Sequence, residues 1–230
     1  DPFFMMTRRS LSTFMNAFTA SDFTAYPFST LNDKDFSNLL SVYLDATFFP
    51  NLNELDFMQE GHRFDFVQND KSQDQIVLKG IVYNEMKGAM SSISSQADQG
   101  LTEHLFPNHT YGYNSGGDPH DIPKLTYQNL IEFHKKHYHP SNAIFFTYGK
   151  IDILSLQNEI QNSVLKYFSP STEKIEVKEC KYFNNPKYAI KNYKPLSNDE
   201  ENHHVLVSWL LGTSLDPVDK MEAKLIESIL

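Results

Sequence analysis

The chain has 230 residues, of which 40% are hydrophobic, enough for the packed core of one large domain or of one and a half ordinary ones. Its 20 basic and 29 acidic side chains give a net charge of −9 without a Lys/Arg stripe, which argues against nucleic acid and suits a basic peptide partner. No apolar run approaches the roughly 20 residues of a membrane span, and a single cysteine, Cys180, excludes an internal disulfide.

Helices and strands are predicted from apolar periodicities of about 3.6 and 2 residues. In chain order, the segments with helical periodicity are 3–15, 33–49, 56–59, 79–90, 96–105, 126–138, 152–168 and 219–230. The segments with strand alternation are 16–26, 62–66, 143–149 and 205–209. Of these strands, 143–149 is the most apolar and is expected to be the best buried. The mixture predicts an α/β (α+β) fold with a mixed β-sheet flanked by helices.

The helix at 33–49 has the clearest boundaries of these segments. Asn32 or Thr30 is expected to cap its first turn, because either side-chain oxygen can accept a hydrogen bond from a backbone N–H, and Pro50 ends it. The side chains expected to face inward are Phe36, Leu39, Leu40, Tyr43 and Leu44.

Residues 169–200 are polar, are interrupted by prolines and lack helical periodicity, which indicates a linker. We therefore expect most of a first domain at 1–168 and the beginning of a second, similar domain at 201–230. The chain does not begin with methionine, and its opening residues resemble the interior of a domain. We accordingly expect the sequence to be a fragment of a longer protein.

Glu85 is the most informative residue of the chain. In the helix at 79–90, apolar side chains recur at spacings of three, four and seven residues, and Glu85 falls inside that stripe. A charged carboxylate in a core costs several kcal/mol unless a cation compensates it. The cation is either a metal or an arginine, and helix geometry alone favours the arginine. The candidate arginines are Arg8, Arg9 and Arg63.

Other polar residues carry weaker signals. His134 and His137 are three residues apart, so one helical face can present both to a metal. They also lie near a helix C-terminus, where they offset the helix dipole beside two lysines that repel a cation, and we favour this structural role. Cys180 has no neighbouring histidine and is expected to be inert. The loop ending at Gly116 and Gly117 is expected to form a tight turn rather than a phosphate site.

Several motifs together resemble the presequence protease and falcilysin group of the pitrilysin/insulinase metallopeptidases. The order and spacing agree from residue 1 to about 150, and a weaker, collinear likeness continues to residue 230. The motifs that carry the resemblance are residues 12–28, Gln59–Arg63, Val82–Ala89, Asn114–Pro119 and Tyr138–Asn142.

The resemblance implies an insulinase-like domain of an inverted zincin, a zinc metalloendopeptidase. In this family one helix carries His-x-x-Glu-His, with two Zn²⁺ ligands and the general base, and a glutamate on a second helix is the third ligand. Glu85, in Asn-Glu-Met-Lys-Gly, matches that third ligand. The His-x-x-Glu-His pattern does not occur in this sequence. No catalytic residue is therefore expected in the chain, and the isolated chain is expected neither to hold zinc tightly nor to cleave peptides.

The resemblance also implies that Asn16, Ala17 and Phe18 bind substrate. In the family the corresponding strand is the sheet edge along which a peptide is added as a further strand, held by main-chain hydrogen bonds. Without the resemblance, this segment would be interpreted as an ordinary core strand. The implied partners are unstructured peptide substrates and the remaining domains of the same protein. The implied location is intracellular, in mitochondria or another organelle.

Two alternatives remain at this point. The first is a non-catalytic homologue of the same superfamily that serves as a peptide-binding subunit or scaffold. A carboxylate in an apolar stripe argues against it, and the presence or loss of His-x-x-Glu-His upstream of the chain would discriminate. The second is an unrelated α/β binding domain in which Glu85 pairs with an arginine, which requires all the motif matches to be accidental.

Overall fold

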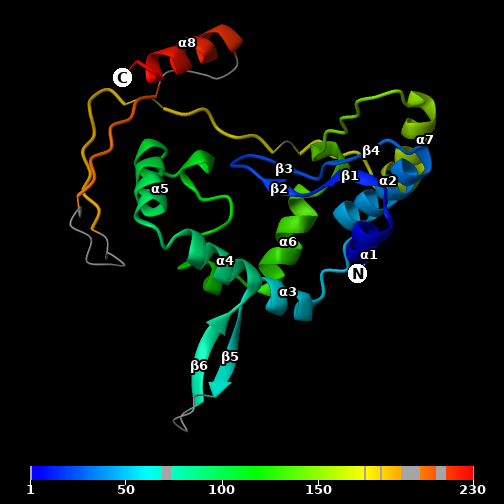
Figure 1. The fold of residues 1–230 in the computed structure, drawn as a ribbon, viewed down its shortest axis with the longest axis horizontal. Coiled ribbons are helices and arrows are strands. Elements are labelled where there is room, and N and C mark those ends of the chain that lie inside the picture. Colours follow the sequence, from blue (N-terminus) through cyan, green and yellow to red (C-terminus); the bar gives the residue numbers. More distant parts are fainter. Residues whose placement is uncertain are drawn as a thin grey trace.

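The structure is a computed structural model that describes residues 2–68, 74–173, 175–181, 183–192, 203–210 and 216–229. Its α-helices are α1 Pro2–Arg9, α2 Asp33–Phe48, α3 Glu54–Glu60, α4 Ile81–Ala89, α5 Ile93–Leu105, α6 Tyr127–His137, α7 Ile153–Ser163 and α8 Pro217–Glu227. Its strands are β1 Ser12–Met15, β2 Phe18–Thr19, β3 Thr24–Ala25, β4 Phe28–Thr30, β5 Arg63–Gln68 and β6 Asp74–Lys79. Helices combined with antiparallel strand pairs confirm the predicted α/β class (Figure 1).

The main core lies where α2 packs against α7. As predicted, Asn32 caps α2, and its Oδ1 accepts a hydrogen bond from the N–H of Asp35 over 3.0 Å. The inward-facing residues of α2 are also confirmed, with Leu39 fully buried and Phe36 packed on the core cluster. The buried members of that cluster are Leu40, Leu44, Phe48, Leu156, Ile160 and Val164.

The pairs β1–β4 and β2–β3 are two halves of one antiparallel hairpin. The pairs Met15↔Phe28 and Phe18↔Ala25 share one register, so the strand path continues between them. A single strand over 16–26 is therefore a wrong prediction. The chain instead reverses direction within that segment, between β2 and β3.

Pro27 explains why the ladder of this hairpin is interrupted. The N–H of Asn16 donates to the Pro27 carbonyl over 3.1 Å, but proline has no N–H with which to return the bond. The Tyr43 hydroxyl of α2 fills the gap, because it donates to the carbonyls of Asn16 at 3.4 Å and Pro27 at 3.3 Å. The core helix thus supports the hairpin at its weakest point.

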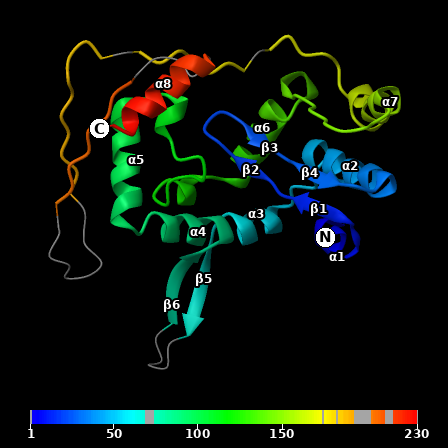
Figure 2. The same ribbon diagram turned by 45° about the horizontal axis from the view of Figure 1, so that its top comes forward.

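A second hairpin, β5–β6, projects away from the helices beside α4 (Figures 1 and 2). Its register runs from Arg63↔Lys79 to Gln68↔Asp74. At its base, Gly61 and Gly80 approach so closely that a Cβ on Gly80 would overlap the Gly61 carbonyl. Only glycine therefore fits where β6 passes into α4. The strand predicted at 62–66 is confirmed, and its partner β6 was not predicted.

The apolar segment 143–149 does not form the buried strand that its alternation predicts. Ile144, Phe146 and Tyr148 are 95%, 85% and 94% exposed, and no strand of the described residues pairs with the segment. The alternating segment at 205–209 is likewise not a strand. Alternation marks a segment that can pair, but a strand exists only where a neighbour satisfies its N–H and C=O groups.

The remaining differences concern element ends. The helix predicted at 3–15 ends at Arg9, because the Ser10 hydroxyl and the Leu11 N–H both bond to Asp35 Oδ2 and direct the chain into β1. The described parts of the predicted linker 169–200 contain neither helix nor strand, whereas residues 174, 182 and 193–200 of it lie outside the described residues. Within the described residues, no helix has both the length and the apolar character that crossing a membrane requires.

Candidate functional site

Glu85 lies on an exposed face of α4. The helix forms where predicted, but Met86 is its one buried residue, and Glu85 is exposed to solvent. Val82, one turn before Glu85, is 39% exposed, and Ala89, one turn after it, is also exposed. The expectation of a buried Glu85 is therefore wrong for the described structure. The apolar stripe exists, and Met86 in it is buried, but its residues next to Glu85, Val82 and Ala89, are exposed in the described structure.

Met86 shows what holds α4 in place. A Cβ on Gly116 would overlap the Met86 sulfur, so the loop after Tyr113 packs directly against the helix. The loop is the predicted tight turn, in which the N–H of Gly117 donates to the Asn114 carbonyl over 3.0 Å and Gly117 has a φ of +97°. Glycine tolerates that conformation without a steric penalty. The Asn-Ser-Gly-Gly turn therefore supports the helix that carries Glu85.

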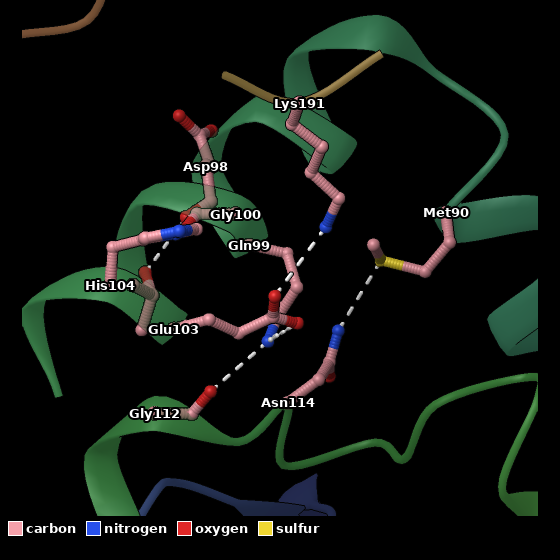
Figure 3. A network of polar contacts seen from close by, with 10 residues as sticks. Met90, Asp98, Gln99, Gly100, Glu103, His104, Gly112, Asn114 and Lys191 are labelled. Carbon is pink, nitrogen blue, oxygen red and sulfur yellow. Dashed lines mark hydrogen bonds and ion pairs between the residues drawn. The ribbon is translucent and has the colours of Figure 1, made fainter. Parts of the chain in front are cut away.

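A polar network fixes the end of α4 to its surroundings (Figure 3). Asn114 Nδ2 donates to the sulfur of Met90, the C-cap of α4, over 3.4 Å. On α5, Gln99 Nε2 donates to the Gly112 carbonyl over 3.1 Å, while Glu103 pairs with Lys191 over 3.4 Å. The loop thus contacts the end of α4 through Asn114, while α5 contacts both the loop and the segment 183–192.

Among the described residues, Glu85 pairs with none of the candidate arginines and lies in no cluster of metal-binding side chains. Arg63 forms its ion pair with Asp65 over 3.4 Å, and the ion pairs of the described residues do not include Glu85. No three His, Cys, Asp or Glu side chains of the described residues come together as a metal site requires. The exposed carboxylate of Glu85 is of a type that zinc accepts as a ligand. The described residues do not provide the further ligands of a complete zinc site.

The two histidines of α6 have structural contacts. His134 Nε2 lies 2.9 Å from the carbonyl of Thr47, and because a carbonyl only accepts, the ring donates this bond and joins α6 to α2. His137 stacks on Phe133 with ring centroids 4.2 Å apart. Burial lowers the pKa of His137, and the neighbouring Lys136 lowers it further. These contacts agree with the structural role favoured for the pair.

Cys180 lies beside a histidine after all. Its sulfur is 3.6 Å from Nε2 of His109, a residue 71 positions away in the chain. The same Nε2 donates to the carbonyl of Lys178 over 2.6 Å, so the ring is held by the segment that carries the thiol. Sequence spacing could not reveal this contact, because it depends on how 175–181 crosses the loop after α5.

The residues predicted to bind substrate, Asn16, Ala17 and Phe18, lie where β1 continues into β2, with Phe18 as the first residue of β2. Asn16 and Phe18 face the partner strand, so Ala17 directs its backbone groups toward the outer edge of the hairpin, as alternate residues of an antiparallel pair do. No described strand pairs with that edge. The Ala17 N–H meanwhile bonds to Oδ1 of Asn16 over 2.8 Å. Phe18 is 49% exposed.

Two tyrosines outside the hairpin, Tyr138 and Tyr111, position it. The hydroxyls of Tyr26 and Tyr138 are 2.7 Å apart and form a hydrogen bond. Burial is the main cause that raises the pKa of Tyr26, and this hydrogen bond raises it further. The Tyr111 hydroxyl donates to Asp22 near the hairpin tip over 2.8 Å. In the sequence, only the Tyr138–Asn142 motif drew attention to one partner of the Tyr26–Tyr138 bond. No hydrogen bond, ion pair or ring contact of the described residues joins Glu85 to residues 16–18.

Comparison with known proteins places these features in a family context. A profile of the Peptidase M16 inactive domain matches residues 124–230. Over its full length, the chain is 46% identical to proteins called "Presequence protease, mitochondrial" from Xenopus laevis and Mus musculus, across 233 aligned residues. The protein of the same name from Drosophila melanogaster is 55% identical over 152 residues, which are 66% of this chain. The chain spans 23%, 22% and 15% of the lengths of these three relatives.

Proposed function

Because the chain belongs to the M16 peptidase family, we propose that it is part of a zinc metalloendopeptidase that degrades short unstructured peptides, with Glu85 as a zinc ligand. The observation that carries the proposal is the position of Glu85 on α4 between Val82 and Ala89, apolar residues that are exposed in the described structure. An apolar face suits contact with another helix, and a carboxylate within such a contact needs a cation. A zinc ion shared with residues of that covering helix satisfies both requirements.

The described residues fit one part of this site. Glu85 offers carboxylate oxygens, which zinc accepts as ligands, on a helix fixed by Met86 and by the cap at Met90. When bound, zinc would lower the pKa of a coordinated water toward about 7. The other ligands and the general base are expected from residues outside this chain. Within the chain, the role of α4 and of the Asn114–Pro119 turn is to hold one ligand in place.

Substrate binding is assigned to the outer edge of the β1–β2 strand at Asn16, Ala17 and Phe18. A peptide laid along this edge gains main-chain hydrogen bonds irrespective of its sequence, and a folded protein has no free strand to offer. The Tyr43 hydroxyl supports this hairpin from the inner side, through the carbonyls of Asn16 and Pro27, and leaves the outer edge free for an added strand. The short side chain of Ala17 leaves room beside an added strand.

The wider assignments follow the relatives. We assign the protein to mitochondria, as the names of its relatives state for them. Its partners are unstructured peptides and further domains of the same protein, with a first domain at 1–168, a linker at 169–200 and a second domain from 201. A non-catalytic homologue is the second candidate, supported by the match of 124–230 to a domain described as inactive. Glu85 lies outside that match.

The test uses the protein extended to the length of its relatives and an unstructured peptide of about 20–30 residues, which is a single unpaired strand. We expect zinc-dependent cleavage that Glu85→Gln lowers by at least about 100-fold, since even outer-shell substitutions at metal sites cost 10–100-fold. Bound zinc, measured by mass spectrometry, should fall in parallel. Lys87→Gln, an exposed change on the same helix, is the matched control.

Each other outcome has a definite meaning. Full activity and zinc content in Glu85→Gln would remove Glu85 from the ligand set. Peptide binding without cleavage by the unsubstituted protein would establish the scaffold instead of the enzyme.

A further inference from the structure

The β5–β6 hairpin has one apolar face that nothing in the described structure covers. Its register places Phe64 opposite Leu78 and Phe66 opposite Ile76, so these four side chains form two adjacent cross-strand pairs on the same face. Phe64, Phe66 and Ile76 are 77%, 71% and 66% exposed. We call these four residues the hairpin patch.

The opposite face of the hairpin, which we call the polar face, carries Arg63, Asp65, Gln75 and Lys79 together with Val67 and Val77. The charges at its base pair with one another. Asp65 Oδ2 bonds to Lys79 Nζ over 3.2 Å and to Arg63 Nη2 over 3.4 Å. These two cations hold the pKa of Asp65 below its usual value, with the hydrogen bond from Lys79 as the largest cause. The hairpin patch occupies the other face, between this charged base and the Gln68↔Asp74 pair at the far end of the hairpin.

An isolated two-stranded hairpin is at best marginally stable in water, and a contiguous exposed apolar patch usually marks an interface. This hairpin nevertheless has a fixed direction. His62 Nε2 donates to the Leu125 carbonyl over 2.8 Å, and the close approach of Gly61 and Gly80 leaves its base no room to rearrange. The hairpin thus holds the patch out from the helices in a fixed direction, as an arm for docking does (Figures 1 and 2).

We propose that the hairpin patch is the docking site for the part of the full-length protein that lies outside residues 1–230. Relatives that match this chain over its whole length are more than four times longer, since the chain spans 22–23% of them. The patch carries no charge, which suits a permanent contact within one polypeptide, as obligate interfaces are the more apolar ones.

The docking has a consequence for Glu85. Gly80 is the single residue between β6 and α4, so a domain that packs on the hairpin patch also acquires a fixed position relative to the Glu85 helix. This consequence rests on the proposed function, whereas the docking itself does not. The patch is thus assigned to assembly of the protein, and not to contact with its substrate.

Site-specific photo-crosslinking in the full-length protein tests the proposal. The photoreactive residue p-benzoylphenylalanine is placed at Phe66, in the patch, or at Gln75, an exposed residue on the polar face, as the matched control. We expect position 66 to crosslink within one polypeptide to a peptide outside residues 1–230, with at least about five times the yield of position 75. The same crosslink should form in Glu85→Gln and in the presence of a chelator, which separates this test from that of the zinc site.

Three results would overturn the proposal. They are a crosslink between two copies of the protein, a crosslink to added substrate peptide, and equal yields at the two positions. Because the photoreactive residue itself disturbs the patch, a second measurement compares Phe66→Ser with Gln75→Ser. Hydrogen exchange of the β5–β6 amides in the full-length protein should accelerate about tenfold or more in the first variant only. Unchanged exchange in Phe66→Ser would also overturn the proposal.

Discussion

Helices α2 and α4 have comparable apolar stripes in the sequence and opposite environments in the structure. Six residues of α2 are buried, whereas Met86 is the one buried residue of α4. The difference lies in what faces each helix, because α2 packs against α7, whereas on α4 the loop with Gly116 covers Met86 and leaves Val82 and Ala89 exposed. An amphipathic pattern therefore predicts which face will be buried, and a partner element decides whether it is.

The largest expected effect is at Leu39, which is fully buried on α2. Leu39→Ala should lower the free energy of unfolding by about 3 kcal/mol, from lost burial and the cavity left behind. Val82→Ala, the matched change on α4, should cost less than about 1 kcal/mol because Val82 is already 39% exposed. Urea unfolding of the 230-residue chain measures both, and equal losses would mean that α4 is covered in solution.

Two glycines sharpen the comparison within α4. Gly80→Ala should destabilise the chain by about 2 kcal/mol, because the added Cβ meets the Gly61 carbonyl and the backbone must shift. Gly88→Ala should instead stabilise it by about 0.5–1 kcal/mol, since its Cβ meets open space and alanine favours the helix. Thermal unfolding of both variants measures these opposite effects. A lower midpoint temperature of unfolding in Gly88→Ala would contradict the prediction.

The helix starts differ as well. Asn32 caps α2 through its side chain, whereas the N-cap of α4, Gly80, has no side chain to offer. Asn32→Ala should therefore cost about 1 kcal/mol and Asn32→Asp little, because aspartate retains the accepting oxygen. The urea midpoints of unfolding measure both losses of stability. An equal loss in Asn32→Ala and Asn32→Asp would contradict a capping role for Asn32.

The smallest effect concerns pH and α6, which has no fully buried residue. Since burial and Lys136 lower the pKa of His137, its contribution to stability is present above the ordinary histidine pKa of about 6.5 and is lost as pH falls through the lowered value. NMR titration of the ring measures that pKa. Lys136→Ala should raise it and Glu173→Gln should lower it further, because the Glu173 charge opposes the shift. Shifts in the reverse directions would refute this account.

Local signals located every α-helix of the described residues, because caps, prolines and periodicity act within a few residues. Asn32 and Thr126 mark helix starts in the sequence as they do in the structure. Long-range properties were predicted poorly. The exposure of Glu85 depends on what lies across α4, and the contact of Cys180 with His109 spans 71 positions. The role proposed for Glu85 comes from the family resemblance, because no local pattern contains it.

The bond between Tyr26 and Tyr138 joins residues 112 positions apart, whereas the hairpin that contains Tyr26 closes within 19 residues. Closing the longer loop has the greater entropic cost, so the hairpin can form before it is attached to α6. We therefore expect Tyr138→Phe to speed unfolding more than it slows folding, as contacts absent from the transition state do. During folding, the hairpin that contains the edge strand therefore forms first, and its position relative to the helices is fixed afterwards.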